Sequence, residues 1–203
     1  MRVSKEKAAQ NRQHILTAAA RLFREHGIPA TGVDSITKEA GLTHGGLYSQ
    51  FGSKEVIAAE AIRFALAESK RVSQRVAEGK QGRDAFRSIV ARYLSPEHRD
   101  SPGQGCVVAA LATDIARQPQ SVRAAFTKEL GDMFELLARL MPGDDPSRRY
   151  DDAIAAFAGM VGALILARAV NDEPLAERIL QAAAKRVTQR TNVRRPARRT
   201  KGS

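Results

Sequence analysis

The chain has 203 residues, of which 43% are hydrophobic and 27% charged, and it contains one cysteine. This length and apolar content can bury the core of one generous domain or of a small domain joined to a larger one. A single cysteine excludes an internal disulfide framework, and the polar start of the sequence has no apolar signal segment. The expected compartment is the cytoplasm. The longest uncharged stretch, residues 153–167, is shorter than a membrane-spanning helix of roughly 20 residues, so no membrane contact is expected.

The net charge of +11 lies mostly at one end of the sequence. Residues 185–203 contain eight Lys and Arg and no acid, which leaves a charge of only +3 for the rest of the chain. Residues 192–203 contain no aromatic side chain and almost nothing apolar, which predicts a flexible basic tail. Such a tail either adds non-specific attraction for phosphate groups or serves only as a solubilising end.

Helical periodicity recurs along the whole sequence, and no segment alternates like a half-buried strand. The predicted fold class is therefore all-α. The first helix carries an apolar stripe that includes Ile15 and Leu22, and Gly27 followed by Pro29 ends it.

Two very short helices come next, over residues 33–40 and 44–50. Thr31 and Asp34 have the spacing of a capping box for the first, and Gly41 suits the left-handed position after its end. Thr43 is the predicted cap of the second helix.

The sequence after these two short helices predicts longer ones. Gly52 and Ser53 lead into a long fourth helix, which breaks near Gly79. Further helices are predicted over residues 86–94, from about 106 to 115, from 120 to 140, over 153–170 and over 175–187, with a loop over 96–105.

The segment over residues 153–170 is apolar nearly all round, with Arg168 as its only charge. A helix in water tolerates this composition only if every side is covered. Gly159 and Gly162 would let another helix approach closely. With the amphipathic final helix this predicts a four-helix interface between two copies of the chain, whereas both helices could also simply complete a monomeric core.

The two short helices have the size and spacing of a helix-turn-helix, whose second helix enters the major groove of double-stranded DNA. The second helix combines polar side chains with Gly45 and Gly46, which permit close approach to a partner. A phosphate could be held jointly by the first amides of the fourth helix, the Ser53 cap and the Lys54 ammonium. The hydroxyl of Tyr48 could contact another phosphate.

Residues 31–57 read TGVDSITKEAGLTHGGLYSQFGSKEVI and resemble the DNA-binding signature of the TetR family of bacterial regulators. The matching positions are Val33, Ile36, Ala40, Gly41, Leu42, Thr43, Gly45, Leu47, Tyr48, Phe51, Ser53, Lys54 and Glu55. The length and helix count of the rest also fit this family. Beyond Ile57 no residue-level match is evident.

The resemblance implies roles for seven residues of this segment. Thr43, Tyr48 and Lys54 would anchor the phosphate backbone. The residues that would face the base edges are His44, Gly45, Ser49 and Gln50. Family members commonly have other residues at the last two positions, and often Thr where this chain has Gly46, so no known operator can be carried over. Gln50 could pair with an adenine or could simply face solvent.

The resemblance also implies a domain organisation. A three-helix, helix-turn-helix domain would span residues 1–55, and a larger helical domain for ligand binding and dimerisation would span residues 56–191, before the tail. The ligand would be a small apolar or aromatic effector that changes the separation of two DNA-reading heads on a pseudo-palindromic site. Candidate lining residues, which could equally be ordinary core, are Phe86, Tyr93, Phe126, Met133, Phe134, Phe157 and Met160.

Cys106 follows a Gly-rich segment at the predicted start of a helix, where the helix dipole favours a thiolate. This position is compatible with a thiol sensor. A buried cysteine next to Val107 and Val108 is the simpler reading.

Two other classes of function, an enzyme and a DNA-packaging protein, fit this sequence less well than a regulator. The four histidines are scattered, and no metal-ligand spacing, phosphate loop or nucleophile elbow is present, so no metal, cofactor or catalysis is expected. A sequence-blind packaging protein would rely on the basic tail, and the specific helix-turn-helix signature argues against it. The sequence therefore predicts a ligand-released homodimeric repressor.

Overall fold

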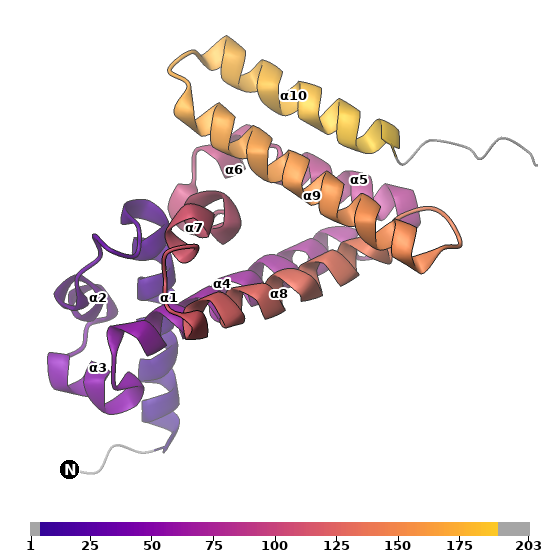
Figure 1. The fold of residues 1–203 in the computed structure, drawn as a ribbon. Helices are drawn as coiled ribbons and strands as arrows, with labels where there is room; N and C mark the ends of the chain where they lie inside the picture. The colour runs from indigo at the N-terminus through magenta and orange to yellow at the C-terminus, as the bar shows by residue number, and fades with distance from the viewer. Residues whose placement is uncertain (1–4, 191–203) are drawn as a thin grey trace, which may run out of the picture.

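The computed structural model describes residues 5–190, and the tail predicted over residues 192–203 lies outside them. All regular elements within the described range are helices, which confirms the all-α class (Figure 1). The α-helices are α1 (Lys5–His26), α2 (Val33–Ala40), α3 (His44–Phe51), α4 (Lys54–Ala77), α5 (Gly82–Tyr93), α6 (Pro96–Arg99), α7 (Val107–Ile115), α8 (Gln120–Ala138), α9 (Pro146–Ala169) and α10 (Glu173–Arg190). A short 3-10 helix, η1 (Pro102–Gln104), precedes α7.

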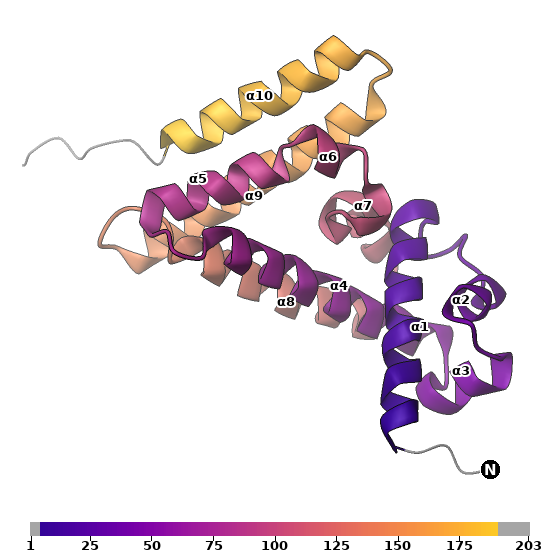
Figure 2. The ribbon, with the colours of Figure 1, turned by 180° about the vertical axis from the view of Figure 1, so that it is seen from behind.

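The helices form a small head and a larger body. The head consists of α1, α2 and α3, and α4 leads from it along α8 into the body (Figure 1). Seen from behind, α5 and α9 lie between the α4 and α8 pair and the outermost helix α10 (Figure 2). Because α4 runs unbroken through residue 55, the predicted boundary between the two parts of the chain falls inside a helix.

Local sequence explains the bounds of the head's helices. Gly41 has the left-handed φ of 66° that ends α2, and the Thr43 hydroxyl accepts the Gly46 N–H at 3.3 Å to start α3. Ser53 caps α4 in the same way. The capping box expected at Thr31 is wrong, because Gly32 is the N-cap of α2 and the buried Thr31 hydroxyl donates to the Gly27 carbonyl instead.

The loop predicted over residues 96–105 is also wrong in part, because it contains α6 and η1. Ser95 accepts the His98 N–H at 3.2 Å, and Pro96 stands at the first helical position, where its missing N–H costs nothing. These are ordinary helix-start signals in a segment too short to show periodicity.

The core runs continuously from the head into the body. Phe23 of α1, Ile57 of α4, Phe86 of α5 and Leu164 of α9 are all fully buried in it. The head and the body therefore share packed side chains.

Helix α9 is long and apolar enough to cross a membrane by length and composition alone, although the longest uncharged stretch within it is shorter. In the structure it packs against α7, α8 and α10, and its Phe157 and Met160 are buried. A third of its most apolar window is buried within the chain. Its contacts make it a helix of the body, with one apolar face left exposed.

Candidate nucleic-acid interface and effector cavity

The recognition helix α3 has one buried side and one exposed side. Leu47 is fully buried and Phe51 is 5% exposed, so these two side chains fix the helix in the head. Tyr48 is 43% exposed, and no atom lies near the open side of Gly45. The helix therefore presents a polar surface with a flat patch, as a helix that enters a DNA groove requires.

Arg12 of α1 holds α3 in place, and the sequence analysis missed it. Its guanidinium donates to the Gln50 backbone carbonyl at 2.9 Å and forms an ion pair with Glu60 of α4. It also lies 4.2 Å from the centre of the Phe51 ring, a cation–π contact. One side chain thus joins α1, α3 and α4. Its partners are distant in sequence, so no local pattern points to it.

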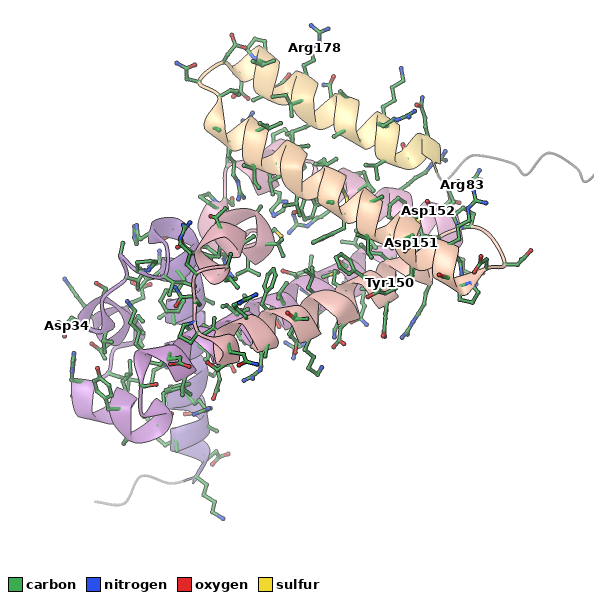
Figure 3. All side chains as sticks on the ribbon, in the orientation of Figure 1. Asp34, Arg83, Tyr150, Asp151, Asp152 and Arg178 are labelled. Carbon is green, nitrogen blue, oxygen red and sulfur yellow. The ribbon has the colours of Figure 1, made fainter. Side chains whose placement is uncertain are left out.

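Two of the predicted base-facing residues are engaged within the head. The His44 Nε2 lies 2.5 Å from an oxygen of Asp34, which stands on α2 at the outer edge of the head (Figure 3). The Ser49 hydroxyl donates to the Gly46 carbonyl at 2.9 Å. If either side chain contacts a DNA base, it must give up its bond within the head or share that bond with the base.

The residues of the predicted phosphate site lie at the start of α4. Lys54 is the first residue of that helix, Ser53 caps it, and the Lys54 ammonium donates to the Pro29 carbonyl at 3.3 Å. Free amides and the positive end of the helix dipole lie at the same place. The Lys54 ammonium itself contacts the segment before α2, and its role at a phosphate stays a prediction.

A cavity of about 300 Å³ lies in the body between α1, α4, α5, α6, α8 and α9. Four of the predicted lining residues border it, namely Tyr93, Met133, Phe157 and Met160. The other three, Phe86, Phe126 and Phe134, do not. The ring of Phe134 packs between Phe157 and Tyr150, which is the core role that the sequence left open.

The polar lining of the cavity escaped the sequence analysis. Arg24 of α1 is half-buried, and its Nε donates to the Gly103 carbonyl at 2.8 Å. Burial lowers the pKa of the Arg24 guanidinium, but an arginine stays charged at neutral pH. The polar residues that line the cavity belong to different helices, and only the fold brings them to one wall.

The Tyr93 hydroxyl is buried in this wall beside the Cys106 thiol, which is only a weak acceptor, and it donates to no oxygen or nitrogen of the described residues. Burial is the main cause that raises the pKa of Tyr93 well above its ordinary value, so the group is a neutral donor. An unpaired buried hydroxyl costs about 1–3 kcal/mol. A ligand that accepts a hydrogen bond from this hydroxyl would recover this cost.

His98 is already satisfied. Its Nδ1 lies 2.6 Å from the Tyr93 carbonyl, which makes Nδ1 the protonated nitrogen, and its Nε2 accepts the Cys106 N–H at 3.0 Å. Burial lowers the pKa of His98, so the ring is neutral at pH 7. It positions Tyr93 and Cys106 and has no free ring nitrogen for a ligand.

Cys106 is 5% exposed and borders the cavity as the N-cap of α7. Its role as a thiol sensor stays a prediction, which labelling of the native protein with a thiol reagent would test. The low exposure agrees with the alternative prediction that Cys106 is an ordinary buried cysteine.

The cavity is connected to the DNA-reading head through α1. Thr17 and Arg24 border the cavity from this helix. At the end of α1 the Ile28 N–H donates to an Asp114 oxygen at 3.0 Å, which fastens the head to α7. One helix of the head, α1, therefore also forms part of the cavity wall.

Comparison with known proteins identifies the family. Residues 15–61 match the model of the family described as bacterial regulatory proteins, tetR family. The transcriptional regulator LmrA of Bacillus subtilis is 30% identical over 177 residues, which cover 81% of this chain and 90% of LmrA. The regulator AcrR of Shigella flexneri is 41% identical over 59 residues, or 29% of this chain and 27% of AcrR.

Solved structures share the fold at low sequence identity. A TetR transcriptional regulator from Legionella pneumophila has a TM-score of 0.75 and 20% identity, covering 94% of this chain and 99% of that chain. The reduced form of NemR from E. coli has a TM-score of 0.70 and 20% identity, covering 88% and 95%. With the match to LmrA over most of both chains, the chain belongs to the TetR family and is a DNA-binding transcriptional regulator, not an enzyme.

Proposed function

We propose that this regulator is a homodimeric repressor that binds a pseudo-palindromic site on double-stranded DNA and is released from it by a small effector. The observation that carries the proposal is that one helix, α1, both braces the recognition helix through Arg12 and borders the cavity through Arg24. Occupancy of the cavity and the position of the head are then linked through one rigid element. Such a protein acts in the cytoplasm, where bacterial DNA is found.

The exposed face of α9 supports the dimer. Ile154, Ile165 and Leu166 are exposed large apolar residues on this helix, and the small residues Ala158 and Gly162 lie between them on the same face. A strip of this kind is covered when two copies pack α9 and α10 into a four-helix interface. A two-fold dimer places two recognition helices in successive major grooves of an inverted repeat.

Selection from a random duplex library at near-physiological salt tests the proposal. The full chain should enrich an inverted repeat, since two equivalent heads read two equivalent half-sites. Enrichment of a single half-site would contradict the dimer. Absence of any motif, with a folded sample, would return the packaging protein to consideration.

Removal of the Lys54 ammonium should weaken binding to every DNA sequence. We expect Lys54→Ala to lower affinity uniformly and to reduce the slope of log affinity against log salt concentration by about one unit. Salt titrations on the selected site and on a scrambled site measure both effects. Lys80→Ala, which removes an exposed ammonium at the far end of α4, should change neither. An unchanged salt slope in Lys54→Ala would remove this residue from the phosphate site.

Gln50 should affect the preference for particular DNA sequences rather than the affinity for DNA in general. We expect Gln50→Ala to relax the preference at one base position in each half-site by about 1–3 kcal/mol, with little change on scrambled DNA. The backbone carbonyl that Arg12 binds is kept in this variant, so the position of α3 is preserved. Gln81→Ala, at an exposed position before α5, is the matched control. An unaltered selected motif would make Gln50 a solvent-facing residue.

A further inference from the structure

The lining of the cavity divides by chemistry into apolar side chains and hydrogen-bond donors. Phe64, Met133, Phe157 and Met160 supply apolar surface from three helices. Arg24 and the Tyr93 hydroxyl supply donors elsewhere in the same wall. A site with this division fits an amphipathic molecule better than a purely apolar one.

The charges around the cavity favour a negative ligand. Two guanidinium groups border it, from Arg24 and Arg92, against one carboxylate, Glu68. That carboxylate already forms an ion pair with Arg71. The Arg24 guanidinium, by contrast, has no carboxylate within ion-pairing distance in the described part of the chain.

Tyr93 provides an observation independent of this charge balance. Its hydroxyl is a buried donor that has the weakly accepting Cys106 thiol beside it and no oxygen or nitrogen partner among residues 5–190, although the rings of His98 and Phe157 hold the side chain at centroid distances of 4.8 and 6.0 Å. Arg24, Tyr93 and Cys106 all border the same cavity. An acceptor with several lone pairs bound in this cavity could accept from both the Arg24 guanidinium and the Tyr93 hydroxyl.

We propose that the effector is an amphipathic carboxylate, whose head group binds Arg24 and Tyr93 and whose apolar tail packs among Phe64, Met133, Phe157 and Met160. The effect of this ligand on DNA rests on the proposed function, but its binding does not. A carboxylate at Arg24 competes with the Gly103 carbonyl for the same guanidinium, so binding loosens the contact between α1 and η1.

Three probes with the same tail and different head groups test the proposal. Decanoate, decan-1-ol and decylamine are titrated into the full-length protein at pH 7.5 by calorimetry, each below the concentration at which it self-associates. We expect decanoate to bind about 10-fold or more tightly than decan-1-ol, which corresponds to one charge-assisted hydrogen bond, and decylamine to bind most weakly. Equal or tighter binding of decan-1-ol or decylamine, or no binding of any probe, overturns the proposal.

Tyr93→Phe removes the unpaired hydroxyl and keeps the ring. It should weaken decanoate by about 10-fold, leave decan-1-ol nearly unchanged, and leave thermal stability unchanged or higher, because an unsatisfied buried group is lost. Tyr150→Phe, on a tyrosine outside the cavity, is the matched control. Arg24→Gln should reduce the preference for decanoate over decan-1-ol in the same direction. Undiminished decanoate binding by Tyr93→Phe contradicts the assigned head-group site.

DNA binding by the same samples separates this inference from the proposed function. If decanoate binds with the expected selectivity but does not release the selected DNA, the effector-release mechanism fails and the ligand class stands. If the protein binds its DNA normally but shows no preference for the acid, the ligand class fails and the regulator stands.

Discussion

A Leu166→Glu variant is expected to be monomeric and to lose about 10²- to 10⁴-fold in affinity for its inverted repeat. Leu166 is 57% exposed on α9, so a charge there costs the isolated chain little but would be buried, without a partner, in the proposed interface. Each head then binds its half-site alone. Light scattering after size exclusion measures the assembly, and titration of labelled DNA measures the affinity.

The control for this variant is Ala124→Glu, which places the same charge on an exposed position of α8. It should remain dimeric and bind DNA as the parent does. The helical content of both variants, read by circular dichroism, should match that of the parent. If Leu166→Glu stays dimeric, the exposed face of α9 lies outside the interface.

Leu47→Ala is expected to lower the free energy of unfolding by about 2–5 kcal/mol and to abolish specific DNA binding. Helix α3 spans only eight residues, which is too short to be stable by itself, and Leu47 is its fully buried anchor. Loss of that side chain leaves a cavity under the recognition helix. Chemical denaturation measures the first effect, and titration of the selected site measures the second.

Val56→Ala removes a comparable apolar side chain from the first turn of α4, where it is 41% exposed. We expect a change in unfolding free energy of less than about 0.5 kcal/mol. Full DNA affinity in Leu47→Ala would mean that α3 is held mainly by Phe51 and Arg12.

The head could be predicted from the sequence in detail because its signals are local. Gly41, Thr43 and Ser53 end or cap helices through bonds to residues three or four positions away, and such bonds leave a readable spacing. The capping box that was wrongly predicted at Thr31 also came from a local spacing. This spacing fits a cap, but the Thr31 hydroxyl donates to the Gly27 carbonyl, four residues earlier, instead.

The cavity could be predicted only in part, because its residues come together through tertiary packing. Tyr93, Met133, Phe157 and Met160 were identifiable as adaptable apolar side chains, but the same chemistry describes Phe86, which is fully buried in the core. The identity of a lining residue depends on which side of its helix faces the cavity, and helices buried on several sides leave that choice open.

The polar wall had no sequence signal at all. Arg24 lies on the first helix and contacts Gly103, which is 79 residues away along the chain. From sequence alone, a single arginine on an amphipathic helix is expected to lie on the solvent-exposed side. Its half-buried position follows only from the placement of η1 against α1.

The participation of α1 in the cavity wall has a consequence for how such regulators diversify. Substitutions at Phe64, Met133 or Met160 can change which tail fits, while the head keeps its position. Substitutions at Thr17 or Arg24 alter the helix that supports DNA reading, so each would have to satisfy two selective pressures at once. Among close relatives that respond to different molecules, we therefore expect the side of the cavity formed by α4, α8 and α9 to vary and the α1 side to stay constant.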